Sequence, residues 1–483
     1  MAERFPEHIA LAPDPSTRRG ADGRTFLGGS PLRLLRFTEA GAAAADRVLA
    51  GGPVPAGGAE ALVARRLLDA GLAHPRPLAA PELAVSVVVP VRDDVAGVAA
   101  LLDRLPPRLG EVVVVDDGSA DPEALAAAVG ARATVRRHER SLGPGAARDT
   151  GWRTTSGDVV VFVDADVTPG DGWLEPLLAH LLDPAVGVVA PRVRSRPGST
   201  LLERYERHRS PLDLGPTEAR VVPRSRVAYV PTAALVCRRA VLEALGGFDA
   251  SMRLGEDVDL VWRAVEAGWT VRYEPRSEVV HRPRPTWAAW ARQRRGYGSA
   301  AAALDRRHPG AVAPVELNAW SLAAWALAAL GGRRGAAAGT AVAVGSSLAL
   351  APKLRGRVDD PVPTALRLGG LGTLHAGTWL ARAVWRAWLP VALVAGLRSR
   401  RVRAAAAVAA VVPAVLDRRD AARTGPVGVD PVRWVLVHAA DQAAYAAGVW
   451  RGVLAERSAR CLLPRLSGIP GLVGKSGSPR DGG

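Results

Sequence analysis

The sharpest chemical feature of the sequence is a pair of carboxylates one residue apart at the end of an apolar run. The apolar residues 161–163 lead directly into Asp164, Ala165 and Asp166. Mg²⁺ and Mn²⁺ prefer oxygen ligands, and proteins often hold them with one or two carboxylates together with substrate phosphates. Two aspartates this close, at the end of an apolar strand, would otherwise repel each other. The pattern therefore predicts a divalent-metal site at Asp164 and Asp166.

Two further motifs could bind a nucleotide. Asp116 and Asp117 end another apolar run, just before Gly118. Their carboxylates can accept hydrogen bonds from a nucleobase or a ribose, although the same residues also make a good turn. In the Gly-rich residues 143–151, small side chains permit close backbone approach and Arg148 can meet an anion. An ordinary loop before a helix is the alternative for this segment.

An acidic pair, Glu256 and Asp257, begins a later helical pattern. Negative charge at this position can simply complement the positive end of the helix dipole, an explanation that suits Glu256 better than Asp257. A strand-like run further along ends in His281. A lone histidine is commonly structural, but beside the paired aspartates His281 becomes a candidate metal ligand.

Three aromatic residues follow these motifs. Trp287, Trp290 and Tyr297 have flat faces that could pack against a sugar or an aromatic acceptor. Burial is the alternative, and we expect it for at least one of the tryptophans.

An α/β sheet is expected to bring these residues together. Short runs rich in β-branched residues alternate with helical patterns, and the runs are nearly continuous, as in a mostly parallel, Rossmann-like sheet covered on both faces. In such sheets ligands bind beyond the carboxyl ends of the strands, where the motifs lie. The predicted strands are residues 85–89, 112–115, 134–136, 159–163 and 186–190.

Composition divides the chain into five segments. We expect residues 1–24 to be a flexible N-terminus. Residues 25–81 combine strand-like runs with two helical stretches, at residues 38–49 and 59–70, a size that suits a small winged-helix-like domain. The other predicted segments are a catalytic α/β domain at residues 84–313, an all-α, Ala- and Arg-rich region at residues 314–463 and a disordered tail at residues 464–483.

The charge balance favours anionic partners. Lys and Arg number 63 against 47 acidic residues, a net charge of +16, although an Arg-rich composition also reflects coding bias in a GC-rich genome. The motifs indicate a phosphorylated small molecule rather than nucleic acid. Cys237 and Cys461 are too few for a disulfide framework, and the first 25 residues contain no secretory signal pattern. A cytoplasmic location is expected.

The C-terminal helices are expected to contact the cytoplasmic face of a membrane. The two longest uncharged runs, near residues 317–332 and 335–352, are at or below the roughly 17 to 25 residues that a spanning helix needs. A hairpin of spans would also place Arg333 and Arg334 on the far side, against the positive-inside tendency. Helices lying in an anionic interface, or a soluble bundle, avoid this conflict. The remaining predicted helices are residues 368–381, 387–397 and 404–416.

Taken in chain order, four motifs resemble those of family 2 glycosyltransferases with the GT-A fold. Four motifs in the right order and spacing are far more specific than any one of them. The matching segments are Pro90-Val91-Arg92-Asp93, Asp116-Asp117-Gly118-Ser119, Asp164-Ala165-Asp166 and Gly255-Glu256-Asp257.

The resemblance implies a role for each motif. Asp116 or Asp117 would read the uridine of a nucleotide-sugar donor, and Asp164 and Asp166 would hold the sugar diphosphate with Mn²⁺ or Mg²⁺. Asp257 would be the catalytic base, with Glu256 as the first alternative, and His281 matches a position that supplies a further metal ligand in some relatives. The implied donor-binding set is Pro90, Arg92, Asp116, Asp117, Arg148, Asp164 and Asp166.

A closer resemblance, covering most of the chain, is to the mycofactocin system glycosyltransferases. It implies inverting transfer of glucose from UDP-glucose to a peptide-derived redox cofactor or its precursor, and the N-terminal domain resembles winged-helix peptide-recognition units. The matching stretches include Gly28-Gly29-Ser30-Pro31, Ala73-His74-Pro75-Arg76-Pro77, Ser210-Pro211-Leu212-Asp213-Leu214-Gly215 and Arg307-His308-Pro309-Gly310.

Two departures and three alternatives qualify this interpretation. Asp149 stands where the family commonly has Asn, and the segment from Gln293 lacks the Q-x-x-R-W pattern of processive synthases, which disfavours a cellulose-synthase-like role. A transferase that loads sugar onto a polyprenyl phosphate shares the donor motifs. A non-catalytic peptide-binding carrier is disfavoured by the intact acidic motifs, and a dehydrogenase by the lack of G-x-G-x-x-G after the first strand.

Overall fold

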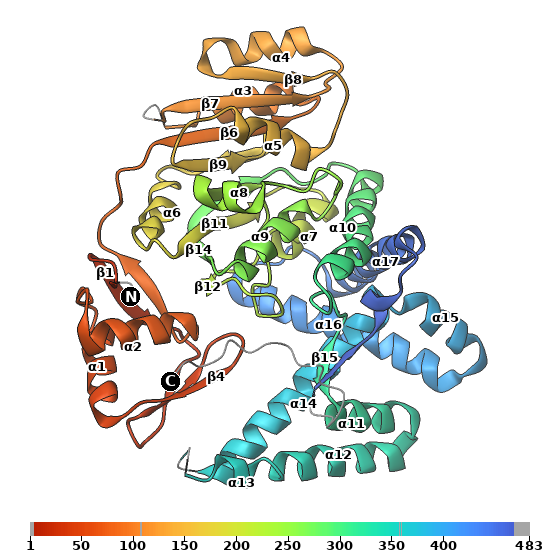
Figure 1. The fold of residues 1–483 in the computed structure, drawn as a ribbon. Helices are drawn as coiled ribbons and strands as arrows, with labels where there is room; N and C mark the ends of the chain where they lie inside the picture. The colour runs from red at the N-terminus through yellow and green to blue at the C-terminus, as the bar shows by residue number, and fades with distance from the viewer. Residues whose placement is uncertain (1–3, 107–108, 357, 359, 468–483) are drawn as a thin grey trace. The chain divides into compact units, whose positions relative to one another are not determined.

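The structure is a computed structural model that describes residues 4–106, 109–356, 358 and 360–467. It forms two compact units, Met1–Trp287 and Ala288–Gly483. The first unit contains the N-terminal domain and the large sheet, and the second is mainly helical (Figure 1).

Four strands form the parallel half of a nine-stranded sheet. β-branched side chains suit the pleated surface of a strand. The valine-rich runs at residues 85–91, 111–117 and 159–163 are mostly buried on both faces, whereas the run at residues 134–138 is largely exposed. All five predicted strands are present. The strands of the parallel half, in spatial order, are β9 (Val159–Val163), β6 (Val85–Val91), β7 (Glu111–Asp117) and β8 (Thr134–His138).

The other half of the sheet is mixed, which corrects the expectation of a mostly parallel sheet. β11 (Val186–Ser195) pairs in parallel with β14 (Thr270–His281) but antiparallel with β13 (Ala234–Arg238). β13 in turn pairs antiparallel with β9, and β10 (Val167–Pro169) and β12 (Ala219–Arg220) pair antiparallel with β14. A loop leads into β13, so no crossover helix imposes a parallel pairing there.

Several helices pack against the large sheet. α5 (Pro144–Arg153) lies against β6 and β7, and a Cβ atom at Gly151 would collide with Cγ1 of Val88. Only glycine permits this close approach. α3 (Val95–Leu102) is capped by the Asp94 side chain, and α9 (Glu256–Glu266) begins after Gly255, which has a φ of 81°. The other helices here are α4 (Pro122–Val129), α6 (Glu175–Ala179), α7 (Leu201–Arg209) and α8 (Arg239–Leu245).

The N-terminal domain has its own apolar core. α1 (Glu39–Leu49) begins at the predicted cap Thr38, and α2 (Gly58–Asp69) matches the second predicted helix. Residues 1–24, expected to be flexible, contain two strands, because residues 9–13 pair with a strand about sixty residues away. The small sheets are β2 (Arg18–Arg19), β3 (Thr25–Gly28) and β4 (Arg33–Arg36), and β1 (Ile9–Pro13) with β5 (Ala73–Pro77). The winged-helix comparison remains an interpretation.

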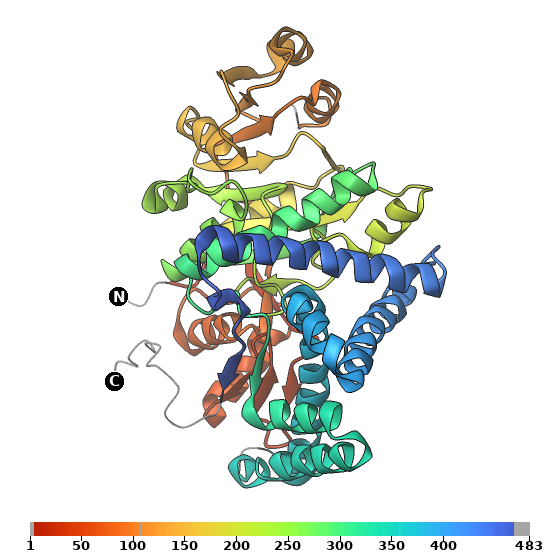
Figure 2. The same ribbon diagram turned by 90° about the vertical axis from the view of Figure 1, so that its right-hand side faces the viewer.

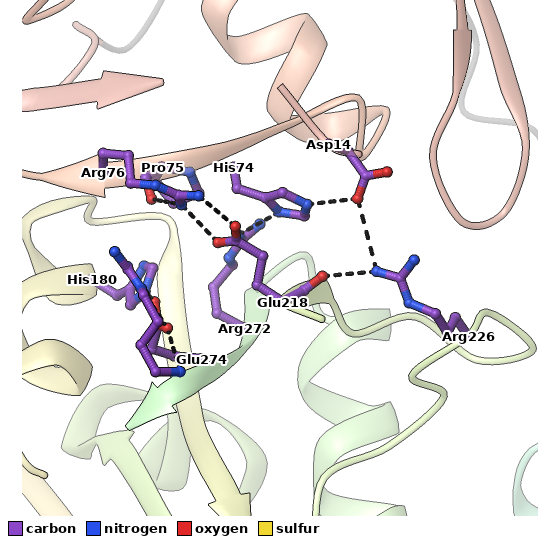
Figure 3. Close-up of polar contacts among 10 residues, drawn as sticks. Asp14, His74, Pro75, Arg76, His180, Glu218, Arg226, Arg272 and Glu274 are labelled. Atoms are coloured by element: carbon purple, nitrogen blue, oxygen red, sulfur yellow. Dashed lines mark hydrogen bonds and ion pairs between the residues drawn. The ribbon is translucent and has the colours of Figure 1, made fainter. Parts of the chain in front are cut away.

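A buried polar network joins this domain to the large sheet (Figure 3). Nε2 of His74 lies 2.8 Å from Oδ2 of Asp14, and Nδ1 of His74 lies 3.0 Å from a guanidinium nitrogen of Arg272. The two contacts fix a neutral tautomer, because Nε2–H donates to the carboxylate and Nδ1 accepts from the guanidinium. Arg76 also pairs with Glu218 of the catalytic domain. The network therefore links Asp14, His74 and Arg76 of the N-terminal domain to Glu218 and Arg272 of the catalytic domain.

We expect acidification to weaken this interface through His74. Burial lowers the pKa of His74 below its ordinary value of 6.5, although the hydrogen bond to Asp14 opposes the shift. Since the unfolded chain binds the proton more tightly, stability is lost as the pH falls through that ordinary value. The urea midpoint of unfolding should therefore fall between about pH 7 and about pH 5, and His74→Gln should reduce this fall.

The control is His375→Gln, which changes an exposed histidine of the second unit. Its pH dependence should match that of the wild type. Burial also lowers the pKa of His180, so some pH dependence should persist in His74→Gln. If the urea midpoint of His74→Gln falls with pH as steeply as that of the wild type, His74 does not link the interface to pH.

The second unit consists of helices and one small sheet. All five predicted helices are present, several of them longer than expected, and α11 lies side by side with α12 (Figure 2). The helices are α10 (Trp287–Arg307), α11 (Ala319–Leu330), α12 (Gly332–Leu348), α13 (Ala351–Leu354), α14 (Pro361–Arg386), α15 (Leu389–Arg398), α16 (Arg400–Thr424) and α17 (Pro431–Glu456).

One helix and two strands of this unit depart from the prediction. α17 was not predicted, because polar residues such as His438, Asp441 and Gln442 interrupt its apolar pattern, yet all three are buried. The region also contains strands, contrary to expectation, because β15 (Glu316–Asn318) finds a parallel partner in β16 (Arg465–Ser467). The rest of the predicted tail, from residue 468, lies outside the described residues.

Among the described residues, one helical stretch, Gly332–Leu354, is long and apolar enough to cross a membrane. The pair α14 and α15, bent by 90°, would make a second if it formed one broken span. Length and composition alone define both candidates.

Candidate active site

A cavity of about 840 Å³ opens where five strands end. β6, β7, β9, β11 and β14 run in the same direction, because β13 is antiparallel to both of its neighbours and so restores the direction across the sheet. The size is typical of small-ligand sites. The cavity is lined at these strand ends by Pro90, Arg92, Asp117, Asp164, Asp166, Arg196, Arg282 and Arg284, and by Arg148 on α5.

The paired aspartates lie at the carboxyl end of β9. Asp164 accepts a hydrogen bond of 2.6 Å from Arg148, and Oδ2 of Asp166 lies 3.3 Å from Nε2 of His281. The antiparallel pairing of β10 with β14 explains the second contact, since Val167 pairs directly with His281. The predicted trio of Asp164, Asp166 and His281 is thus gathered at one edge of the cavity.

The two carboxylates have different proton affinities. Burial raises the pKa of Asp164, although the charge of Arg148 opposes the shift. Burial acts in the same direction on Asp166, but its hydrogen bond to His281 and the positive charges nearby prevail and lower its pKa. Of the two, Asp166 is therefore the carboxylate that stays ionised more readily.

The donor set is chemically suited to Mg²⁺ or Mn²⁺. Two carboxylates and an imidazole are ligands that such ions accept. Each carboxylate now contacts a positively charged side chain, Asp164 with Arg148 and Asp166 with Arg284 at 3.4 Å. Among the described residues, no group of three or more His, Cys, Asp or Glu side chains is arranged to hold a metal ion. Binding would thus require the carboxylates to exchange these partners for the ion.

Arg148 links the paired aspartates to the second acidic motif. Its guanidinium is buried and donates both to Asp164 and, at 2.9 Å, to Glu256. Burial and the charge of Asp257 raise the pKa of Glu256 to about 7, despite the opposing charge of Arg148. Breaking one partner from such a buried pair usually costs about 3–5 kcal/mol. Arg148 thus lines the cavity and, through its pair with Glu256, holds the start of α9 beside the paired aspartates.

Asp257 lies at the start of α9, beside this network. Its Oδ1 accepts a hydrogen bond from the backbone N–H of Val258. Burial raises the pKa of Asp257, and the negative charge of Asp164 acts in the same direction. A carboxylate with raised proton affinity is better suited to accept a proton than an ordinary surface aspartate. Neither Asp257 nor Glu256 is among the residues that line the cavity.

The two aspartates of the first acidic motif, Asp116 and Asp117, have different structural roles. Asp117 lines the cavity and accepts hydrogen bonds from His138, from the Ser141 hydroxyl and from the backbone N–H groups of Leu142 and Gly143. It therefore fixes the loop that precedes α5. Asp116 is 1% exposed, accepts from the Ser119 N–H group and pairs with Arg137. Of the two candidates for reading the uridine, Asp117 is the one at the cavity.

The three aromatic candidates lie on α10 and differ in exposure. Trp290 is 2% exposed and packs against the guanidinium of Arg294, with 5.2 Å between the charge centre and the ring centroid. Trp290 is thus the tryptophan for which the expected burial holds, and its burial argues against a role as an exposed acceptor face. Trp287 is 47% exposed and Tyr297 is half-buried.

Sequence reasoning missed three arginines of the cavity. Arg196 follows β11, and Arg282 and Arg284 follow β14. Arg282 also forms an ion pair with Asp94, the cap of α3. Their position just beyond strand ends was the available signal, since the same rule identified the aspartates. The cavity thus carries positive side chains as well as its acidic pair, and one of them, Arg284, contacts Asp166.

A fold with this cavity defines the class of the protein, and comparison with known sequences agrees. The family profile described as "Glycosyl transferase family 2" matches residues 86–245, which contain β6 to β9, the Gly-rich loop and the paired aspartates. Together with the relative that aligns over nearly the whole chain, this match makes the chain a glycosyltransferase family 2 enzyme.

A relative that aligns over nearly the whole chain gives a more specific family. The chain is 41% identical over 473 residues to the pre-mycofactocin glycosyltransferase of Mycobacterium tuberculosis, covering 96% of this chain and 99% of the relative. It belongs to that family, the mycofactocin system glycosyltransferases. Glycosyltransferase AglE of Haloferax volcanii is 29% identical over 42% of this chain and 67% of its own length. Among solved structures, the mannosyltransferase PcManGT of Pyrobaculum calidifontis is 22% identical, over 64% of this chain and 92% of its own, with a TM-score of 0.38.

Proposed function

We propose that the protein transfers glucose from UDP-glucose to a peptide-derived acceptor, a precursor of mycofactocin, with inversion at the anomeric carbon. The observation that supports this proposal best is the cavity at the common strand edge, where the acidic pair Asp164 and Asp166 faces three arginines. The acceptor class comes from the name of the M. tuberculosis relative, which aligns over nearly the whole chain.

The diphosphate of the donor would lie between the acidic pair and the arginines. Arg196, Arg282 and Arg284 carry positive charge that can balance two phosphates, and arginine can bind a phosphate through two parallel hydrogen bonds. Mn²⁺ or Mg²⁺, held by Asp164, Asp166 and His281, would supply a Lewis acid that neutralises the leaving diphosphate. The base and ribose would extend toward Asp117, Pro90 and Arg92.

The acceptor side of the reaction requires a general base. Asp257 would take the proton of the acceptor hydroxyl while the hydroxyl oxygen attacks the anomeric carbon and the bond to the diphosphate breaks. A single displacement of this kind needs no covalent enzyme intermediate. The raised pKa of Asp257 supports this role, since it increases the affinity of the carboxylate for that proton.

The remaining parts of the chain have proposed supporting roles. The N-terminal domain would recruit the peptide-derived acceptor, in keeping with its small sheets and two helices. The chain would act in the cytoplasm, at the inner face of the membrane. Trp287, the exposed aromatic residue of α10, would offer a flat face to the acceptor.

Transfer assays with the purified full-length chain test the proposal. UDP-glucose and Mn²⁺ should yield a glucosylated pre-mycofactocin, identified by mass spectrometry, and no product with a polyprenyl phosphate. The lipid phosphate is the second candidate acceptor, because the helical unit exposes many apolar side chains. Glucosylation of the lipid alone would assign the enzyme to envelope synthesis, and turnover of neither acceptor would favour a peptide carrier.

A further inference from the structure

The second unit exposes far more large apolar side chains than the first. Of the 29 large apolar residues that are exposed in the described part of the chain, 22 belong to the second unit, although it is the smaller one. Single exposed apolar residues are ordinary on protein surfaces, but contiguous groups of them mark interaction sites. The exposed apolar residues of the second unit therefore mark an interaction site wherever they lie close together.

The densest group lies on α15 and the adjoining part of α16. On the ten-residue helix α15, Val391, Leu393, Val394 and Leu397 are 56%, 62%, 56% and 79% exposed. Figure 1 shows α15 at the edge of the helical unit, where it packs on α16. On α16 the exposed residues Val408, Val411, Val412 and Val415 follow the i, i+3, i+4, i+7 spacing of one helix face. We call these eight residues the apolar edge.

Arginine dominates the charge of the segment that carries the apolar edge, up to Asp417 on the later part of α16. Residues 361–416 contain seven arginines and no Asp or Glu. Four of the seven stand at the junction of α15 and α16, and all four are exposed: Arg398, Arg400, Arg401 and Arg403. Arg401 and Arg403 donate to the backbone carbonyls of Leu330 and Gly396. A surface that combines exposed leucine and valine with exposed arginine is complementary to an anionic lipid interface, where acyl chains lie beneath phosphate groups.

The geometry disfavours a membrane-spanning role for this edge. α15 has ten residues and ends in arginines, whereas a spanning helix needs roughly twenty apolar residues. It also meets α14 at a bend of 90°. A short helix that turns away from its predecessor and carries its charge at one end is suited to lie in the plane of the interface.

We propose that the apolar edge inserts shallowly into a membrane surface containing anionic lipids, with the four junction arginines binding headgroup phosphates. This surface lies outside the donor cavity and is independent of the proposed reaction. Binding should require both components, because the arginines supply attraction at a distance and the leucines and valines supply burial. It should weaken as salt screens the arginines.

Vesicle flotation of the full-length chain tests the proposal. The wild type should float with vesicles of phosphatidylcholine mixed with phosphatidylglycerol at low salt, but not with phosphatidylcholine alone. Arg398→Gln/Arg400→Gln should weaken binding by roughly 10- to 30-fold, since each basic residue near an anionic surface contributes about 1 kcal/mol. Leu393→Gln/Leu397→Gln should weaken it by at least about 10-fold, through lost apolar burial.

Two controls keep the outcome clear. Leu454→Gln changes a leucine of α17 that is 75% exposed but does not belong to the apolar edge, and it should bind vesicles as the wild type does. Turnover in solution should be equal in all variants, so that vesicle binding and catalysis can fail separately. No flotation of the wild type at low salt would overturn the proposal. So would a concentration-dependent dimer abolished by Leu393→Gln/Leu397→Gln, because it would assign the edge to a second copy of the chain.

Discussion

Asp257→Asn should reduce kcat by a factor on the order of 10² to 10⁴ while leaving UDP binding unchanged, because that is the usual contribution of a positioned general base. The amide keeps the shape of the carboxylate but cannot accept the proton of the acceptor hydroxyl. The backbone hydrogen bond from Val258 can be retained by the amide oxygen. Steady-state kinetics with pre-mycofactocin, together with calorimetric titration of UDP, measure the two quantities separately.

The pH dependence of the wild type gives an independent readout. Because the pKa of Asp257 is raised, its ionised form is lost as the pH falls through a value above the ordinary 3.8 of an aspartate. The acid limb of kcat should therefore lie above that value and should disappear in Asp257→Asn. Thermal unfolding should be close to that of the wild type, since the variant removes a charge whose ionised form burial disfavours.

Glu256→Gln is the matched comparison, since it makes the same change one residue earlier. Glu256 pairs with the buried guanidinium of Arg148, so Glu256→Gln should lower the free energy of unfolding. At a temperature where the variant stays folded, its kcat should fall less than that of Asp257→Asn. The pKa of Glu256 is raised to about 7, so an acid limb near neutrality that vanishes in Glu256→Gln would make Glu256 the base. Normal transfer by Asp257→Asn would have the same meaning.

Local patterns predicted the elements that carry the site. Five β-branched runs became strands, and the rule that ligands bind beyond the carboxyl ends of strands placed Asp117, Asp164 and Asp166 at one cavity. These predictions succeeded because each depends on a few consecutive residues. Asp116 has the same pattern as Asp117 but faces Arg137, a partner that only the folded sheet brings near.

Long-range pairing explains most of what the sequence did not reveal. β1 forms because residues 9–13 meet residues 73–77, and the antiparallel direction of β13 depends on the loop that leads into it. The sequence predicted burial for at least one tryptophan but did not identify Trp290, since its neighbours on α10 show no continuous apolar face. Charge pairs such as that of Arg148 with Glu256, 108 residues apart, have no sequence signature.

Asp166→Ala should abolish the enhancement of UDP binding by Mn²⁺. Asp166 is the carboxylate of the pair whose pKa is lowered, so it is the ligand most available to a cation near neutral pH. Removing even a supporting residue of a metal site commonly costs 10–100-fold in metal affinity, and a direct ligand should cost at least that much. Calorimetric titration of UDP, with and without Mn²⁺, measures the effect without relying on turnover.

Asp171→Ala is the control, because Asp171 is an exposed aspartate on the turn after β10. It should bind UDP and Mn²⁺ as the wild type does. The arginines of the cavity provide the competing explanation. If Arg196, Arg282 and Arg284 hold the diphosphate without a metal, the wild type will bind UDP equally well in a chelator. Asp166→Ala would then bind UDP more tightly, because Arg284 would lose its acidic partner and turn its full charge toward the phosphates. The sign of the change in UDP affinity thus separates a metal-held diphosphate from an arginine-held one.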